Sequence, residues 1–239
     1  MQTINNPYKL SSPEAYISLL KYNCEIKKSN RYAHRGKLNI TFNDFSQIIN
    51  YHAQQIFFDR KENTIFKFDS AINETLEYLY LWSSFDNNFP GNLNNGILLH
   101  GKKGCGKTAI LESFCKAYTD LLKPINNNHE IKKIWCPEFH NLYLKEHYKY
   151  YYRCNLFLDD FGKDKQEIQS YGTIISPLVE VLCKRYDFGS LTFATTNFNE
   201  SDLYDTYKGT LDDRITSIFN IKFMPGESRR PKLIKQYKT

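Results

Sequence analysis

Apolar residues recur at helical spacing in the first quarter of the chain, and the pattern predicts two helices there. The first begins at Ser12 as N-cap with Pro13 in the first turn. The second spans about residues 43–58, and one of its faces carries Phe45, Ile48, Ile49, His52 and Ile56. Two helices of this size bury little apolar surface by themselves. We therefore expect them to pack on the rest of the chain or on a partner.

From about residue 65 the pattern changes to helices that alternate with short apolar runs. A stripe of Ile72, Leu76, Leu79 and Trp82 predicts one helix. Further helices are predicted over residues 107–122, 137–150 and 177–186, and strands over 96–100, 131–135, 155–160, 190–197 and 217–223. Near-continuous apolar strands between helices are typical of a parallel sheet covered on both faces. We predict an α/β domain over residues 65–239, preceded by a small helical N-terminal extension over residues 1–64.

The segment GKKGCGKT, residues 101–108, matches the phosphate-binding motif G-x-x-x-x-G-K-[ST] without mismatch. The apolar run GILLH precedes it and a predicted helix follows, which is the context that the motif requires. Glycines permit a tight turn whose N–H groups point at phosphate oxygens, and the helix N-terminus favours negative charge. The sequence therefore predicts a nucleotide site formed by Gly101, Lys102, Lys103, Gly104, Cys105, Gly106, Lys107 and Thr108.

Two carboxylates end the apolar run NLFLDD, and a carboxylate at the end of a buried strand is costly unless a cation meets it. Beside the phosphate loop, Asp159 is expected to bind Mg²⁺ opposite the Thr108 hydroxyl. Asp160 is then expected to act as a base or to orient water. The alternative is two exposed acids that end a strand.

Polar residues also end the predicted strand SLTFATTN. Asn197 is a candidate for contact with the γ-phosphate or the attacking water, although Asn at a strand end is usually a turn former. Arg214, in LDDRI, and Arg230, near the C-terminus, are further candidates. Taken alone, both arginines fit surface ion pairs equally well.

The segment NLYLKEHYKYYYR, residues 141–153, interleaves basic and aromatic residues. Such a pattern suits a nucleic-acid strand, because cations attract phosphates and rings stack on bases. An amphipathic helix whose tyrosines pack on the sheet would have the same pattern. The sequence does not decide between the two.

Composition adds a basic balance: the formal net charge is +6, and the lysines and arginines are clustered, which favours a polyanionic partner. The six cysteines have no CxxC spacing, so neither a zinc site nor a redox pair is indicated. No signal peptide is recognisable, and no stretch approaches the roughly 20 apolar residues of a membrane span. We expect a cytoplasmic protein without a membrane partner.

Together, these segments resemble the DnaC/IstB branch of the AAA+ ATPases, which includes replicative helicase loaders and transposition helper ATPases. The resemblance covers about residues 95–231, and the matching segments are, in order, GILLHGKKGCGKT, LFLDDFG, RYDFGSLTFATTN, LDDRI and GESRR. It implies a P-loop NTPase fold, a three-layer sandwich around a five-stranded parallel sheet of order 5-1-4-3-2. It also implies ATP and Mg²⁺ as cofactors and assembly into a ring or helical oligomer.

The resemblance also implies roles for single residues. Asn197 would sense the γ-phosphate, Arg214 would act as an arginine finger on a neighbouring subunit, and Arg230 would be the second sensor. Three features depart from many members: Arg229 stands where a tyrosine is common, nine residues follow Arg230, and the N-terminal region lacks a Cys/His cluster. Asp160, where other AAA+ branches have Glu, is shared by many members of this branch and is compatible with slow hydrolysis.

The sequence thus predicts a slow ATPase that assembles on single-stranded DNA and loads or regulates a replicative helicase. One rival is a transposition helper, whose partner would be a transposase. Others are a weakly hydrolysing nucleotide-dependent adaptor and a small-molecule kinase, although no lid segment with arginines supports the kinase. ATPase stimulation by single-stranded DNA would favour a loader or helper over the adaptor and the kinase.

Overall fold

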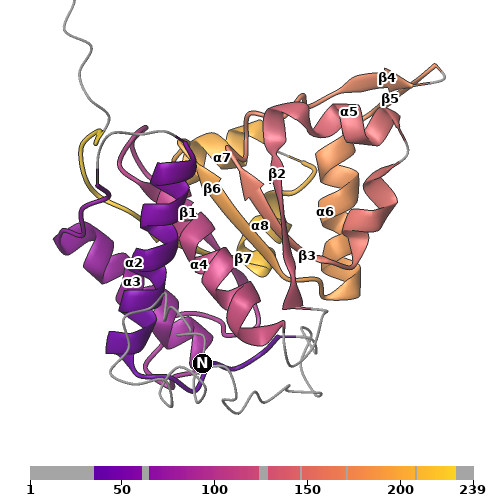
Figure 1. The fold of residues 1–239 in the computed structure, drawn as a ribbon. Coiled ribbons are helices and arrows are strands. Elements are labelled where there is room, and N and C mark those ends of the chain that lie inside the picture. The colour runs from indigo at the N-terminus through magenta and orange to yellow at the C-terminus, as the bar shows by residue number, and fades with distance from the viewer. Residues whose placement is uncertain are drawn as a thin grey trace, which may run out of the picture.

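Five parallel strands form the centre of the computed structural model, in the order β2-β3-β6-β1-β7 (Figure 1). The model describes residues 35–60, 65–123, 129–145, 147–170, 172–207 and 209–229. The strands are β1 (Gly96–His100), β2 (Ile131–Trp135), β3 (Asn155–Asp159), β6 (Thr192–Thr196) and β7 (Phe219–Phe223). Counted along the chain as strands one to five, they have the predicted order 5-1-4-3-2.

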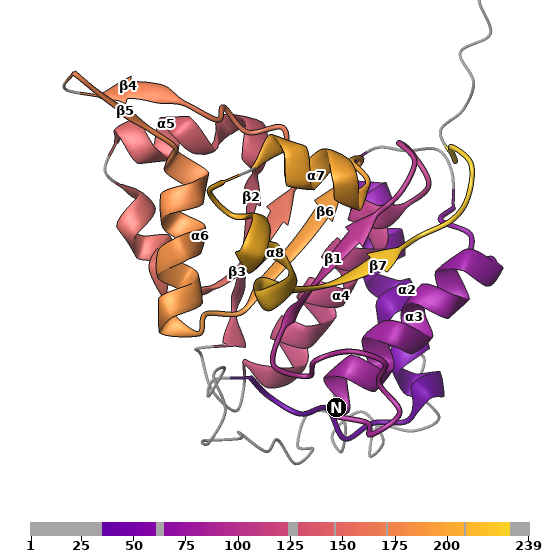
Figure 2. The ribbon, with the colours of Figure 1, turned by 180° about the vertical axis from the view of Figure 1, so that it is seen from behind.

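Helices cover both faces of this sheet (Figures 1 and 2). One face carries α2 (Phe42–Asp59), α3 (Ser70–Ser83) and α4 (Lys107–Leu122). The other carries α6 (Pro177–Phe188), α7 (Glu200–Thr206) and α8 (Asp212–Ile218). Side chains along β1 alternate between the two layers: Ile97 and Leu99 pack with the first group of helices, and Leu98 packs with the second. The predicted three-layer α/β architecture is confirmed.

The helix α2 shares its hydrophobic core with α3 and α4. The Phe45 ring lies 5.5 Å from the Tyr80 ring and 6.1 Å from the Phe114 ring, measured between centroids. Nearby, the Leu38 amide donates to the Ser83 carbonyl. The second predicted helix therefore packs on the α/β domain, while the first, at Ser12, lies outside the described residues. A partner-binding role for residues 1–64 stays a prediction.

The single helix predicted over residues 137–150 is wrong. The segment forms three short pieces: a 3-10 turn η2 (Cys136–Glu138), α5 (Phe139–Leu144) and a 3-10 helix η3 (His147–Tyr152). The Tyr143 and Tyr148 rings stack with centroids 4.1 Å apart, and the Tyr143 and Tyr152 hydroxyls both donate to Glu180 on α6. Packing of the tyrosines on α6 thus outweighs the local helical pattern.

The hairpin β4 (Ile168–Ser170) and β5 (Thr173–Ile175), and the helices α7 and α8, were not predicted. The hairpin projects beyond the helical layers (Figure 1). Each of these elements has fewer than eight residues, so none carries a long periodic pattern. In the described ranges, no helix is both long and apolar enough to cross a bilayer.

Substitution Phe45→Ala should destabilise the whole domain by about 3–5 kcal/mol, because the ring is 1% exposed and its removal leaves a cavity between α2, α3 and α4. The matched control is Phe58→Ala on the same helix, whose side chain is 78% exposed and should change stability by less than about 0.5 kcal/mol. Urea unfolding followed by circular dichroism measures both. Equal effects would mean that α2 is not part of the domain core.

Candidate functional site

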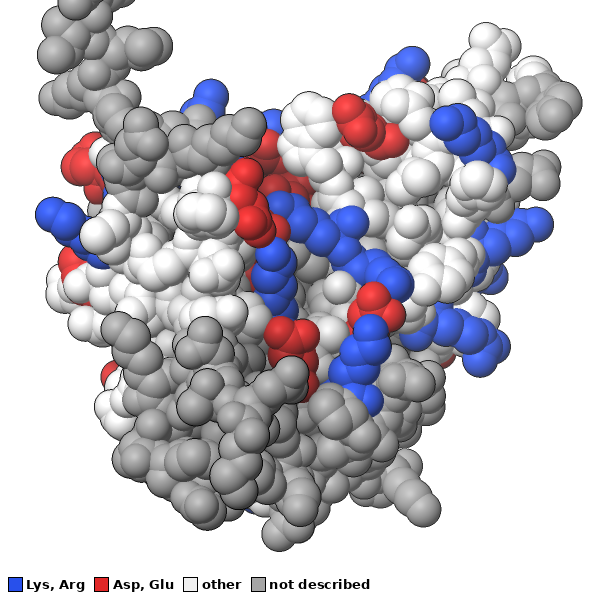
Figure 3. All heavy atoms as spheres, in the orientation of Figure 1, with Lys and Arg blue, Asp and Glu red and all other residues white. Residues whose placement is uncertain are grey.

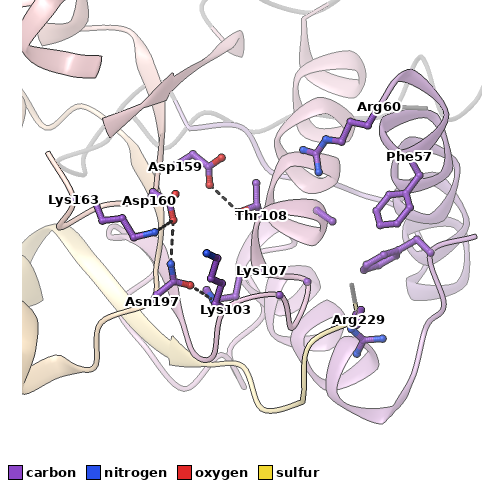
Figure 4. Close-up of a pocket in the computed structure, with 14 residues that line it drawn as sticks. Phe57, Arg60, Lys103, Lys107, Thr108, Asp159, Asp160, Lys163, Asn197 and Arg229 are labelled. Atoms are coloured by element: carbon purple, nitrogen blue, oxygen red, sulfur yellow. Dashed lines mark hydrogen bonds and ion pairs between the residues drawn. The ribbon is translucent and has the colours of Figure 1, made fainter. Parts of the chain in front are cut away.

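A cavity of about 290 Å³ lies at the carboxyl ends of β1, β3 and β6 (Figure 4). Parallel strands bring their carboxyl ends to one edge of the sheet, so residues far apart in sequence meet there. The lining residues are Phe57, Arg60, Phe66, Lys103, Gly104, Gly106, Lys107, Thr108, Ala109, Asp159, Asp160, Lys163, Asn197 and Arg229. The predicted loop, carboxylates and Asn197 thus contribute to one site.

The loop after β1 has a backbone that only glycine adopts easily. Gly104 has φ +88°, and a Cβ there would lie 2.4 Å from the Ser228 hydroxyl oxygen. Gly106 has φ +110° and is the N-cap of α4. These left-handed residues turn the loop around the N-terminus of α4, where free backbone N–H groups favour an anion.

The Lys107 side chain is buried at the base of the cavity. Its ammonium nitrogen Nζ lies 2.7 Å from the Gly101 carbonyl oxygen, 2.8 Å from that of Lys102 and 3.0 Å from Asn197 Oδ1. Burial lowers the pKa of Lys107, and the nearby Asp160 carboxylate opposes part of that shift. The Lys107 ammonium therefore places a partly desolvated positive charge beside the loop.

Asp159 joins the loop to the sheet. Its Oδ1 accepts hydrogen bonds from the hydroxyls of Thr108, at 2.8 Å, and Thr195, at 2.7 Å. Its Oδ2 lies 3.3 Å from the Lys133 ammonium on β2. The predicted pair of Thr108 and Asp159 is thus in direct contact.

This pair offers hard oxygen donors of the kind that Mg²⁺ prefers. Among the described residues, no group of three or more His, Cys, Asp and Glu side chains could hold a metal ion. Mg²⁺ in protein sites commonly takes one or two protein oxygens and completes its shell with phosphate oxygens and water. The Thr108 and Asp159 oxygens therefore fit Mg²⁺ that is bound together with phosphate.

Asp160 has its backbone in the left-handed region, with φ +60°. Its Oδ1 accepts from Lys163 Nζ, at 2.9 Å, and from Asn197 Nδ2, at 3.2 Å, while its Oδ2 accepts from Trp135 Nε1, at 3.3 Å. Burial alone would raise the pKa of Asp160, but the contacts with Lys163, Trp135 and Lys107 outweigh it and lower that pKa. The carboxylate is thus held ionised, with both oxygens engaged.

Arg229 contacts the loop, whereas the predicted second sensor, Arg230, lies outside the described residues. The Arg229 amide donates to the Gly104 carbonyl, at 2.9 Å, and its Nε to the Cys105 carbonyl, at 2.7 Å. Its guanidinium also pairs with Asp69, ahead of α3. Arg229 therefore ties the segment after β7 and the start of α3 to the loop.

Arg214 lies on α8 and does not line the cavity. Its guanidinium carbon lies 5.7 Å from the centroid of the Tyr186 ring on α6. The sequence prediction that Arg214 stays away from the site of its own chain agrees with this position.

Three predicted loop residues also lie outside the cavity lining, namely Gly101, Lys102 and Cys105. Lys102 is exposed and pairs with Glu227 at 2.5 Å, so its side chain faces solvent.

Sequence reasoning missed several lining residues. Phe57 and Arg60 come from the end of α2, and they lie on the side of the cavity opposite the carboxylates (Figure 4). Phe66, from the segment that follows, also lines the cavity. No motif marks them, and only the packing of α2 on α4 brings them there. Lys163 was also missed, although it stands three residues after Asp160, a spacing that allows the two side chains to form an ion pair.

The basic and aromatic segment 141–153 divides between its two predicted roles. Tyr143, Tyr148 and Tyr152 pack with α6, as the structural alternative requires. Lys149 and Tyr150 remain exposed, Tyr150 at 61%, and Lys145 and Arg153 are exposed as well. Figure 3 shows further Lys and Arg side chains across the middle of the same face, interleaved with acidic ones. Exposed basic side chains are therefore present on this segment, and DNA binding by them stays a prediction.

Several solved structures are similar to this chain. A candidate primosome component from Streptococcus pyogenes serotype M3 is 20% identical with a TM-score of 0.50, and the match covers 68% of this chain and 84% of that one. DnaI is 23% identical with a TM-score of 0.48, covering 68% and 86%. The DnaC helicase loader is 17% identical with a TM-score of 0.47, covering 68% and 95%.

At these identities the likeness shows the fold alone, an α/β fold with a five-stranded parallel sheet. The resemblance drawn from the sequence motifs is thus confirmed at the level of the fold. No protein-family model matches the chain. No curated protein sequence matches it either.

Substitution Arg229→Met should loosen the loop, because it removes the bonds from the guanidinium to Cys105 and Asp69. Hydrogen exchange measured by mass spectrometry should become faster over residues 101–108, with little change in β1. The matched control is Lys102→Met, which removes only the exposed ion pair with Glu227 and should leave exchange unchanged. Unchanged exchange in Arg229→Met would mean that the backbone contacts alone hold the loop.

Proposed function

We propose that this protein binds and slowly hydrolyses ATP, assembles on single-stranded DNA, and loads or regulates a replicative helicase. The observation that carries the proposal is the convergence of Lys107, Thr108, Asp159, Asp160 and Asn197 on one cavity in an AAA+ fold. The similar solved structures include a helicase loader and a candidate primosome component, which supports a role in replication.

In this proposal the loop N–H groups and the Lys107 ammonium bind the phosphates, and Thr108 and Asp159 hold Mg²⁺. When bound, Mg²⁺-ATP supplies the transferable phosphoryl group and a metal charge that stabilises the leaving phosphate. Asp160 orients the attacking water and accepts its proton, and Asn197 orients the same water from the end of β6. Each of these side chains comes from a strand end or a helix N-terminus.

Slow turnover is the expected behaviour, because the Asp160 oxygens already accept three hydrogen bonds from Lys163, Asn197 and Trp135. A carboxylate offers about four lone-pair sites, so little acceptor capacity is left for water. The same observation favours a second candidate, a nucleotide-dependent adaptor in which binding rather than hydrolysis changes the partner contact. The two candidates differ in turnover and not in the binding site.

Completion of the site by a neighbouring subunit is part of the proposal. Arg214 is on α8, outside the cavity of its own chain, and is half-buried on the Tyr186 ring. An arginine supplied in trans contributes about 10³–10⁵ to phosphoryl-transfer rates in known systems. Assembly into a ring or helical oligomer would bring this residue to the next subunit's nucleotide.

Substitution Lys107→Ala should lower the affinity for ATP by about 10- to 100-fold, because one charge-assisted contact with the phosphates is lost. Displacement of a fluorescent ATP analogue measures the affinity. The matched control is Lys116→Ala, an exposed lysine on the same helix and outside the cavity, which should bind like the wild type. Single-stranded DNA should stimulate the ATPase of the wild type. A wild type that binds no nucleotide would contradict the proposal.

Substitution Arg214→Ala should leave ATP binding unchanged and reduce hydrolysis by about 10³-fold or more. A mixture of Arg214→Ala with Lys107→Ala should recover activity, since some interfaces then pair an intact loop with an intact arginine. Phosphate release from each variant alone and from the mixture measures this. No recovery, with mixed assemblies verified by cross-linking, would return Arg214 to a packing role on Tyr186.

A further inference from the structure

Lys163 lines the cavity from a tight turn that begins at the carboxylate Asp160. The Lys163 amide donates to the Asp160 carbonyl, at 3.1 Å, and Gly162 in the turn has φ +94°. A Cβ on Gly162 would lie 2.6 Å from the Phe198 ring, so the turn also requires glycine for space. The turn brings the Lys163 side chain back to Asp160, and the Lys163 ammonium nitrogen lies 2.9 Å from Asp160 Oδ1.

Other cations near the site contact acidic residues outside the cavity lining, and Lys133 also contacts Asp159 within it. Lys133 and Arg60 both contact Glu112, and Arg229 pairs with Asp69. Lys163 contacts Asp160, a residue of the cavity itself. Its side chain is 35% exposed, so it can change partner without unpacking the core. Figure 4 shows Lys163 and Lys107 entering from different elements on the two sides of Asn197 and Asp160.

A carboxylate at this place creates an electrostatic problem for a phosphate ligand. The negative charge of Asp160 repels a phosphate that comes close enough for one water molecule to contact both groups. An ammonium group placed between the two anions offsets that repulsion. Lys107 reaches Asn197 Oδ1 and two loop carbonyls, whereas Lys163 already touches Asp160 and lines the same space.

We propose that Lys163 is a second phosphate-binding lysine of this site, which exchanges its contact with Asp160 for the terminal phosphate of a nucleoside triphosphate. Lys163 then makes the site prefer a triphosphate to a diphosphate, and its departure removes one of the two hydrogen bonds that Asp160 Oδ1 accepts. This inference rests on the proposed nucleotide function. It assigns a specificity role to a residue that lies outside the phosphate loop and outside the matched motifs.

The experiment compares magnesium complexes of ADP and of the non-hydrolysable analogue AMPPCP, titrated by calorimetry into the full chain. Substitution Lys163→Met should weaken AMPPCP binding by about tenfold and ADP binding by less than about twofold. Lys163→Arg keeps the charge and should restore most of the preference. The matched control, Lys165→Met, removes an exposed lysine two positions away that does not line the cavity, and should bind both nucleotides like the wild type.

Tryptophan fluorescence gives a second measurement that does not depend on turnover. The chain has two tryptophans: Trp82 is fully buried, while Trp135 is 48% exposed and donates to Asp160. A change at Asp160 should therefore alter the emission of Trp135 above a constant contribution from Trp82. AMPPCP should shift the emission of the wild type more than ADP does, and this difference should disappear in Lys163→Met.

The outcomes separate this inference from the proposed function. A wild type that binds neither nucleotide contradicts both. A wild type that binds nucleotides, with equal or no losses of ADP and AMPPCP affinity in Lys163→Met, overturns the role of Lys163 and leaves the nucleotide function standing. Selective loss of AMPPCP binding, with loss of the fluorescence difference, supports the exchange of partners.

Discussion

The carboxylate of Asp159 connects the parts on which the site depends. One of its oxygens accepts from the hydroxyls of Thr108, at the start of α4, and Thr195, on β6, and the other faces Lys133 on β2. A charge at the end of a buried strand is costly, and these three donors offset the cost only if all three elements keep their register. Stability of the sheet edge and geometry of the site therefore have the same cause.

The features that the sequence predicted are those determined by the local apolar pattern and by the residues at the strand ends. The apolar runs gave the strands, and α4 begins at Lys107 as the motif required. Once the strands are parallel, Asp159 and Asn197 must reach the same edge, so the candidate site followed from the order of the motifs. Helix α2 was also predicted, because its apolar stripe is long and regular.

The parts that the sequence did not reveal depend on contacts between distant segments. The tyrosine pattern of residues 141–153 predicts one helix. In the structure, Glu180 on α6 accepts hydrogen bonds from two of these tyrosines, and the segment is divided into shorter helices. Arg229 looked like a departure from a family pattern, but its partners are backbone carbonyls at Cys105 and Lys67, which no motif can mark. Phe57 reaches the cavity only because α2 packs on α4.

Asn197 connects phosphate binding to the base. Its amide oxygen accepts from the Lys107 ammonium, and its amide nitrogen donates to the Asp160 carboxylate. A carboxylate in this place could accept from Lys107 but could not donate to Asp160, and it would repel both Asp160 and a phosphate. A hydroxyl could do both but is too short to span two groups that an amide reaches on opposite sides. A planar amide thus meets both requirements. A shift of the Lys107 ammonium therefore moves Asn197 and changes the hydrogen bond that Asn197 donates to Asp160.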